Sequence, residues 1–118
     1  MATTLSEREA VKADVSYGAI HTESDAATVA WDASNGNRQK VTLAGNRTFT
    51  FSGWNSGQTV LLIIKQDGTG SRTVTWPTIR WAEGDTEPTL TTTGGKEDWI
   101  LIVYDGTDYV GFVVGQNV

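Results

Sequence analysis

The side chains best suited to catalysis in this chain are one histidine and two pairs of neighbouring carboxylates. His21 is the only histidine, and no Gly-x-Ser-x-Gly motif supplies a nucleophile to complete a hydrolytic triad. Asp85/Glu87 and Glu97/Asp98 have the residue types of a glycosidase pair, which needs two carboxyls roughly 5–10 Å apart across a groove. Neighbouring acids are common in loops, and a single small domain rarely builds a sugar-cleaving groove. We therefore predict no catalytic residue and no enzymatic activity.

Three aspartates in glycine-containing turns are the candidates for binding a metal ion. Asp67 and the pair Asp105/Asp108 could offer carboxylate oxygens to calcium, but neither turn has the alternating ligand spacing of a known calcium loop. Aspartate in such turns is explained by hydrogen bonds from backbone amides to its own carboxylate. The chain has no cysteine, which excludes thiolate zinc sites. We predict no metal site and no cofactor.

Two short motif matches carry little weight. Gly68-Thr-Gly70 is not followed by a helical pattern, so it lacks the helix N-terminus that a phosphate-binding loop uses. Asn46-Arg-Thr48 matches a glycosylation sequon, which matters only in a secretory pathway.

Charge and hydrophobicity exclude several classes of partner. Nine Lys and Arg against 14 Asp and Glu give a net charge of −5. An acidic surface repels phosphates, so we predict no nucleic-acid partner. No apolar run approaches the roughly 20 residues of a membrane helix, and the longest, residues 60–64, is predicted to be a buried strand. The N-terminus lacks the layout of a signal peptide, and the absence of cysteine fits a reducing cytoplasm.

Five tryptophans are many for 118 residues. Trp31 and Trp99 lie in strand-like runs and are predicted to be core residues, whereas the other three lie in turns or irregular segments. Aromatic side chains exposed on loops stack on sugar rings or anchor a protein partner. The alternative is that the loops fold back and the rings cap the core, since large aromatics are mostly buried. The candidate contacts for a ligand or partner are Trp54, Trp76, Arg80 and Trp81.

Strand and turn signals follow one another from Ala26 to the end of the chain. The strands recur at about ten-residue spacing, and Asp67-Gly68 and Asp105-Gly106 are strong hairpin signals, because both residue types tolerate positive φ. We predict an all-β domain over residues 26–118, either an antiparallel β-sandwich or a jelly-roll-like barrel. The predicted strands cover residues 28–32, 39–44, 48–52, 59–66, 73–76, 90–93, 99–104 and 109–114.

Residues 1–25 are predicted to form a short N-terminal arm. Ser6 as N-cap and Glu9 as its capping-box partner favour a short helix over residues 7–13. The apolar positions are too sparse to close a core of their own, so the arm either frays or packs on a neighbouring subunit. The residues predicted to make this subunit or partner contact are Leu5, Val11, Val15, Tyr17 and Ile20.

Several short segments from residue 43 onward form an ordered set. They are Leu43-Ala-Gly-Asn-Arg-Thr48, Gln66-Asp-Gly-Thr-Gly70, Arg72-Thr-Val-Thr-Trp-Pro77, Trp81, Pro88-Thr-Leu90 with a following Thr, and Tyr104-Asp-Gly-Thr107 with Gly111-Phe112. In this order and spacing they resemble a β-rich module that recurs in bacteriophage virion proteins, usually at the end of tail-fibre and minor tail proteins. The resemblance covers the chain from about Trp31 to the C-terminus. It implies a phage particle protein with a β-rich fold and no enzymatic activity.

Here the module follows only a short arm, which favours a small protein of the phage head over a fibre. We expect a non-enzymatic structural protein of the virion that decorates or cements the capsid, with the arm contacting the major capsid protein or a neighbouring subunit. The alternative is a tail-fibre or tail-tip receptor-binding module, seated among tail proteins, whose loop aromatics contact host-surface glycan. Analogy with phage proteins implies a homo-oligomer, specifically a trimer, made in the bacterial cytoplasm and incorporated into the virion.

Overall fold

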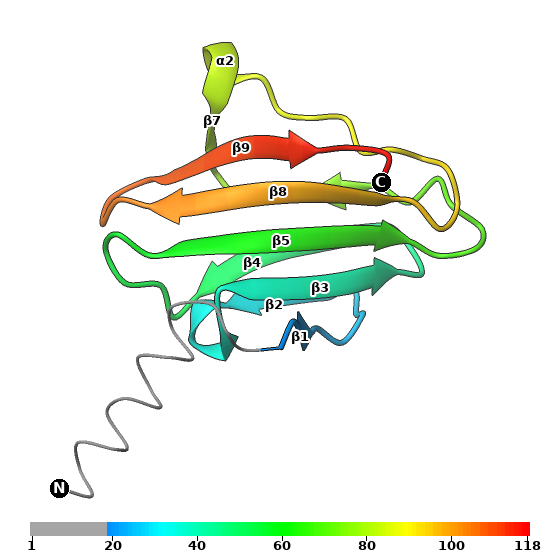
Figure 1. Ribbon diagram of the computed structural model, residues 1–118, viewed down its shortest axis with the longest axis horizontal. Helices are drawn as coiled ribbons and strands as arrows, with labels where there is room; N and C mark the ends of the chain where they lie inside the picture. The colour runs from blue at the N-terminus through cyan, green and yellow to red at the C-terminus, as the bar shows by residue number, and fades with distance from the viewer. Residues whose placement is uncertain (1–18) are drawn as a thin grey trace, which may run out of the picture.

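The computed structural model describes residues 19–118 and confirms the all-β prediction (Figure 1). No helix in this part of the chain is long and apolar enough to cross a membrane. Within residues 19–118 the helical elements are a 3-10 turn, η2 (Ala33–Asn35), and a single turn, α2 (Ala82–Asp85). The strands are β1 (His21–Thr22), β2 (Thr28–Asp32), β3 (Arg38–Leu43), β4 (Arg47–Ser52), β5 (Thr59–Gln66), β6 (Val74–Thr75), β7 (Arg80–Trp81), β8 (Glu97–Tyr104) and β9 (Tyr109–Gly115).

The strands form two sheets, and the chain alternates between them from β1 to β6. One sheet has the order β1-β3-β5-β8-β9-β7, and the other has the order β2-β4-β6. Each return to a sheet places the new strand parallel to the previous strand of that sheet, as in the register of His21 with Gln39 and of Thr28 with Thr48. We call this part, from β1 to β6, the parallel coil. Figure 1 shows β2 and β4 lying behind the larger sheet.

The prediction of an antiparallel sandwich or jelly-roll barrel is not confirmed. Of the seven strand pairings within residues 19–118, only β5 with β8 and β8 with β9 are antiparallel. The hairpin predicted at Asp105-Gly106 is present, with Tyr104 opposite Tyr109. The hairpin predicted at Asp67-Gly68 is wrong, because the chain there leaves β5 and crosses to the second sheet, where β6 pairs with β4.

The physical reason for that error lies in what the Asp67 carboxylate binds. It accepts hydrogen bonds from the backbone amides of Thr69 and Gly70 at 3.1 and 3.0 Å, and it pairs with the Arg72 guanidinium at 2.9 Å. These bonds shape a corner that redirects the chain rather than a two-residue reversal. Asp-Gly signals a tight turn in both cases, but the pairing of the next strand is decided by long-range packing.

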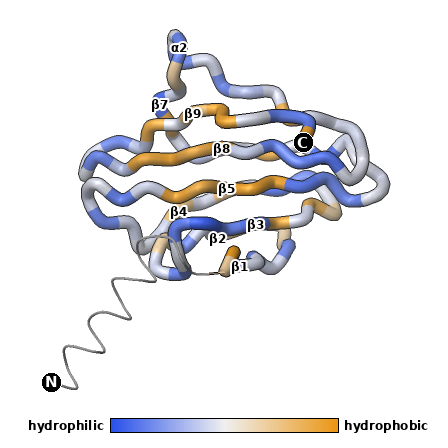
Figure 2. Tube along the Cα trace, in the orientation of Figure 1, coloured by the Kyte–Doolittle hydropathy of each residue, from blue (hydrophilic) through white to orange (hydrophobic). Residues whose placement is uncertain are grey.

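The core lies between the two sheets. Alternate residues of the strands point inward and are almost fully buried, and each large apolar side chain contributes about 1.5–3 kcal/mol by leaving water. Figure 2 shows that the middle of β5 and of β8 is apolar. The inward-facing core residues include Val29, Trp31, Val41, Leu43, Phe49, Val60, Leu62, Ile64, Ile100 and Ile102.

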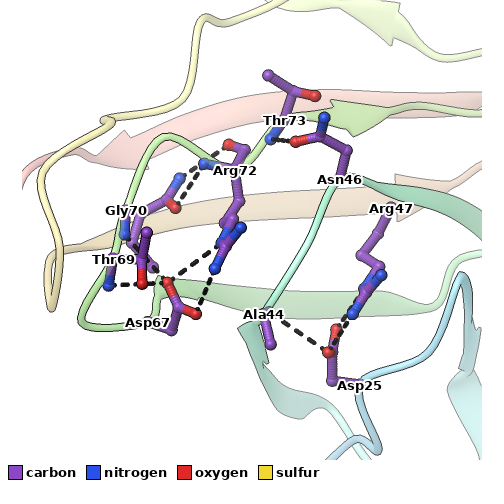
Figure 3. A network of polar contacts seen from close by, with 10 residues as sticks. Asp25, Ala44, Asn46, Arg47, Asp67, Thr69, Gly70, Arg72 and Thr73 are labelled. Atoms are coloured by element: carbon purple, nitrogen blue, oxygen red, sulfur yellow. Dashed lines mark hydrogen bonds and ion pairs between the residues drawn. The ribbon is translucent and has the colours of Figure 1, made fainter.

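Side-chain bonds join successive corners at one end of the parallel coil (Figure 3). The Arg47 guanidinium donates two hydrogen bonds to the Asp25 carboxylate, at 2.8 and 2.7 Å. The Asn46 side-chain oxygen accepts a bond from the Thr73 amide at 2.9 Å. Asp25 precedes β2, Asn46 precedes β4 and Thr73 precedes β6, so each corner is tied to the next one along the coil.

The folded unit begins before the predicted boundary at residue 26. β1 pairs with Gln39 and Lys40 of β3, so the sheet includes residues that the sequence assigned to the arm. Ile20 is 45% exposed just before this strand. The predicted strand over residues 90–93 is absent. The Thr91 carbonyl accepts a hydrogen bond from the Gln66 side chain and the Thr92 carbonyl accepts one from the Ser71 amide, and these bonds do not form a strand ladder. The predicted helix over residues 7–13 and the contacts Leu5, Val11, Val15 and Tyr17 lie outside the described residues.

Candidate functional site

Two of the loop tryptophans extend the core rather than face solvent. Trp81 is only 7% exposed, and its ring contacts Trp76 edge-to-face with centroids 5.0 Å apart. Trp76 contacts Phe49 in the same way at 5.1 Å, and Phe49 contacts Trp31 at 5.2 Å. Such pairs add about 0.5–1.5 kcal/mol beyond area burial. The alternative in which loop tryptophans cap the core therefore holds for Trp81, whereas the Trp76 side chain is half-buried.

Trp54 belongs to a second group of half-buried rings, Phe51, Trp54, Tyr104 and Tyr109, which we call the aromatic platform. Tyr104 and Tyr109 stack with centroids 4.6 Å apart, and Phe51 and Trp54 both contact Tyr109, at 4.8 and 5.4 Å. The Trp54 indole N–H donates to the Trp31 carbonyl at 3.1 Å. Burial raises the pKa of the Tyr109 phenol, with the neighbouring Tyr104 adding to the effect.

Arg80 lies near the platform, on β7, which pairs with β9 at Val110. Its side chain is 68% exposed, and its guanidinium lies 3.6 Å from the Asp108 carboxylate. An exposed pair at this distance contributes little to stability and leaves the guanidinium accessible to another partner. Of the four predicted contact residues, Arg80 is therefore the most accessible and Trp81 the least.

Glu97 and Asp98, one of the two predicted carboxylate pairs, do not converge on a groove. Glu97 and Asp98 are neighbours in β8, so their side chains point to opposite faces of the sheet. Glu97 binds the Lys40 ammonium at 2.7 Å, which lowers the pKa of its carboxyl group. Asp98 is 2% exposed and accepts the amides of Thr91 and Asn117 at 2.6 and 3.1 Å. Both carboxylates therefore have structural partners.

The remaining candidates for chemistry are also used within the fold. His21 lies in β1, with Nε2 3.4 Å from a carboxylate oxygen of Glu23. The Asp105 carboxylate accepts the amides of Thr107 and Asp108, at 2.8 and 2.6 Å, and the pKa of Asp105 is lowered by these two bonds, with that of Asp108 having the larger effect. No group of three His, Cys, Asp or Glu within residues 19–118 is arranged to hold a metal ion.

An exposed apolar strand is the surface feature that sequence reasoning missed. Phe112, Val113 and Val114 of β9 are 39, 45 and 59% exposed, and Val118 near them in the chain is 57% exposed. We call residues 112–115 the β9 edge. The signal in the sequence was the apolar run Phe112-Val-Val114 within the predicted strand over residues 109–114.

A groove of about 470 Å³ runs along the β9 edge. Its floor includes Trp81, Phe112 and Val113, and its other wall is the segment of residues 82–88 that begins with α2. In α2, Glu83 and Gly84 have positive φ, and Asp85 follows at φ 61°. Non-glycine residues rarely adopt this conformation, and the Asp85 carboxylate helps to hold it by accepting the Trp81 amide at 2.7 Å.

A second depression, of about 680 Å³, lies beside η2 and the segment that joins β4 to β5. Side chains around it include those of Ser34, Asn37, Asn55, Ser56 and Gln58, and no charged residue lines it. The residues that line this depression offer hydroxyl and amide groups, but they include no acid, base or activated nucleophile.

Comparison with known proteins gives no assignment. No family model matches the chain, and no curated protein or solved structure matches it.

Proposed function

We propose that this protein is a non-enzymatic structural protein of a bacteriophage virion that decorates or cements the capsid. The observation that carries the proposal is the β9 edge, where Phe112, Val113 and Val114 are exposed together. Adjacent exposed apolar side chains on a folded domain are typical of protein–protein contact surfaces. An assembly protein needs such a surface, whereas an enzyme needs convergent acid, base or nucleophilic groups.

The ordered segments that resemble phage virion modules provide the second support. Two of them, around Asn46 and Asp67, form the bonded corners of the parallel coil, and a third forms the β8–β9 hairpin. The resemblance thus lies in the residues that shape the fold. Repeated copies on a capsid would gain avidity from many individually weak contacts, and a homotrimer would fit the symmetry of such particles.

The second candidate is a tail-fibre or tail-tip module that binds host-surface glycan. The observation that favours it is the aromatic platform, because half-buried Trp and Tyr rings stack on sugars. Trp54 and the accessible Arg80 are the predicted residues that remain suited to this role, with a smaller contribution from Trp76. Under this proposal, Trp54→Ala lowers adsorption of the phage to host cells, and unchanged adsorption would remove the candidate.

Immunogold labelling of intact virions with antibody against this chain separates the two proposals. Gold over the head supports decoration of the capsid, gold confined to the tail end supports the glycan-binding module, and unlabelled particles contradict both. Deletion of residues 1–20 then tests the arm, since it leaves β1 intact. We expect the truncated protein to melt as a folded domain but to lose binding to assembled capsids.

A further inference from the structure

The outer face of the larger sheet, which is turned away from the core, is apolar across three neighbouring strands. Successive residues of a strand point to opposite faces, and residues paired in register point to the same face. Ile100 and Ile102 of β8 point into the core, so Leu101 points outward together with its partners Leu61 and Phe112. The apolar residues of this face, which we call the outer strip, are Leu61, Ile63, Trp99, Leu101, Val103, Val110 and Phe112.

The outer strip has no cover among residues 19–118. Figure 1 shows the larger sheet in front of β2 and β4, and no described segment crosses in front of β5 or β8. Ile63 is 1% exposed but is not part of the core between the sheets, because it lies on the outer face between Lys40 and Trp99 of the adjacent strands. A sheet with one face in water usually alternates apolar and polar residues. β8 is instead apolar at every position from Trp99 to Val103, which is typical of a strand covered on both faces.

Lysine and arginine side chains border the outer strip on both sides. Arg38 and Lys40 of β3 pair in register with outward-facing residues of β5, and Lys65 lies on the same face of β5 itself. On the opposite side, Arg80 of β7 pairs with Val110 of β9. Residues 19–118 contain seven lysines and arginines, and these are four of them. A chain with a net charge of −5 therefore places most of its described cations around one apolar surface.

The positive charge of this border is only partly neutralised by ion pairs within the described chain. The Lys40 ammonium lies 2.7 Å from the Glu97 carboxylate, and the Arg80 guanidinium lies 3.6 Å from that of Asp108. The Arg80 side chain is 68% exposed, so its pair is weak. Lys65 makes no ion pair with any residue of 19–118. The border therefore attracts acidic groups of a partner.

The dimensions of the outer strip fit an α-helix. Strands lie about 4.8 Å apart and rise about 3.4 Å per residue, so the strip measures about 10 Å from β5 to β9 and about 14 Å from Trp99 to Val103. An α-helix is about 10–12 Å wide and rises about 5.4 Å per turn. A helix of about two to three turns that lies along the strands would therefore cover the strip. Its flanking side chains would then lie next to the cations of β3 and β7.

We propose that the outer strip binds an amphipathic helix of a partner protein, in which Asp and Glu border the apolar face. The apolar side chains of this helix pack on Leu101 and Phe112, and its carboxylates face Lys65 and Arg80. Helix on sheet is one of the general ways in which an apolar sheet face is buried. The inference rests on the proposed assembly role, because it specifies the chemistry of the partner that this domain contacts.

Two other occupants of the outer strip fit its charge less well. A second copy of this chain would bring two borders of like charge together if the two strips stacked on each other. Residues 1–18 of the same chain carry Arg8 and Lys12 beside their acids, and their apolar positions are sparse. An acidic amphipathic helix from another protein has neither disadvantage.

The test uses the full chain, labelled with ¹⁵N, and two synthetic helical peptides as probes. Both peptides carry leucine at positions i, i+3, i+4 and i+7. One has glutamate on either side of the leucine face, and its matched control has lysine there. We expect the glutamate peptide to shift the amide resonances of residues 61–63, 99–103 and 110–112, and the lysine peptide to leave them unchanged. Added salt weakens the binding, because exposed charges are screened.

Phe112→Thr tests the apolar contact. Threonine suits a half-exposed strand position, and Phe112 is 39% exposed and outside the core, so the variant should melt near the parent protein. We expect it to bind the glutamate peptide about tenfold more weakly, because a buried aromatic contact is lost. Val113→Thr is the matched control and should retain the binding, since Val113 lies opposite the core residue Ile100 and points to the other face.

Lys65→Gln tests the charged border without changing the outer strip. We expect it to weaken binding of the glutamate peptide about twofold to fivefold, the effect of one exposed ion pair. Lys96→Gln is its control and should bind like the parent protein, since Lys96 is exposed but precedes β8. This pair of variants decides the question if Phe112→Thr does not fold.

Four results would overturn the inference: no shift with the glutamate peptide, shifts centred away from the outer strip, equal binding of the lysine peptide, or binding unaffected by both Phe112→Thr and Lys65→Gln. Three others would identify a different occupant and overturn it as well. They are self-association that Phe112→Thr abolishes, shifts of the same resonances on deletion of residues 1–18, and binding to anionic lipid vesicles that Phe112→Thr abolishes. These measurements use isolated protein, so their failure is distinct from the absence of gold label on virions, which would contradict the proposed function itself.

Discussion

The Asp25 carboxylate and the Arg47 guanidinium form a two-point contact that joins the chain before β2 to the first residue of β4. The two hydrogen bonds measure 2.8 and 2.7 Å and link residues 22 positions apart. Asp25 also accepts the Ala44 amide at 3.3 Å, so one carboxylate holds both sides of a corner. Figure 3 shows this contact beside the Asp67–Arg72 pair, the equivalent contact at the next corner.

Asp25→Asn is expected to reduce the dependence of stability on acid pH. Hydrogen bonding to Arg47 holds the pKa of Asp25 below its usual value. The contribution of the carboxylate is therefore complete above the unfolded pKa of about 3.9 and is lost as pH falls through the lower folded value. The variant should melt below the parent at pH 7, and the two melting curves should converge in strong acid. Glu83→Gln is the control, and a constant gap between variant and parent at every pH would contradict this prediction.

Phe49→Ala is expected to destabilise the domain by about 3–5 kcal/mol, the usual cost of emptying a buried aromatic site. Phe49 is 1% exposed and contacts both Trp31 and Trp76, so the change also removes two ring contacts. Urea denaturation followed by tryptophan fluorescence measures the difference in free energy of unfolding. Thr50→Ala, an exposed change in the same strand, should stay within about 0.5 kcal/mol of the parent. A small loss for Phe49→Ala would show that the sheets repack.

Gly70→Ala should be more harmful than Gly57→Ala, although both glycines have similar positive φ, 75° and 85°. A left-handed conformation costs a non-glycine residue about 1–2 kcal/mol, and this cost applies at both positions. A Cβ on Gly70 would also overlap the Thr92 carbonyl oxygen, whereas nothing lies within 4 Å of a Cβ on Gly57. Thermal melting of the two variants separates backbone strain from steric overlap. Equal losses would mean that the Thr92 segment moves away freely.

Trp54→Phe should lower stability by about 1 kcal/mol, because it removes the hydrogen bond from the indole N–H to the Trp31 carbonyl. The phenyl ring preserves most of the stacking in the aromatic platform, so the measured loss reports mainly on the hydrogen bond. Trp99→Phe is the matched control, since its indole N–H donates to the Glu97 side chain rather than to a backbone carbonyl. A larger loss of stability for Trp99→Phe than for Trp54→Phe would contradict this prediction. Chemical denaturation of both variants gives the comparison.

The sequence predicted most strands of the fold because alternation and turn residues are local signals. β2 and β5 begin and end at the predicted residues, β3 is shifted by one residue at both ends, and β4, β8 and β9 differ by one or two residues at one end. The sheet order could not be predicted, because the pairing of β6 with β4 depends on which corner the chain forms at Asp67, after β5. That corner is held by the local contacts of Arg72 with Asp67 and Gln66, and by the bond from the Gln66 side-chain amide to the Thr91 carbonyl, which is 25 positions away.

The candidate site was predicted only in part, for a related reason. Tryptophans in turns indicate either contact or capping, and the choice depends on the segments that pack around them. Trp81 is buried because Gly111 of β9 lets its ring lie against the strand, with a Cβ there falling 2.5 Å from the ring. The exposure of the β9 edge was not predicted, because a run of apolar residues is also typical of a buried strand.

The position of β5 between β3 and β8 has a consequence for how the chain folds during synthesis. β3 emerges from the ribosome before β5, but β8 follows it by a long segment that includes β6 and β7. The apolar middle of β5 therefore remains without one of its neighbours until residues 97–104 have been translated. Among the strand pairs of residues 19–118, β8 with β9 is the one closed by a short turn, and both of these strands are translated after β5. A ribosome stalled before residue 97 would hold a chain with an open, aggregation-prone strand.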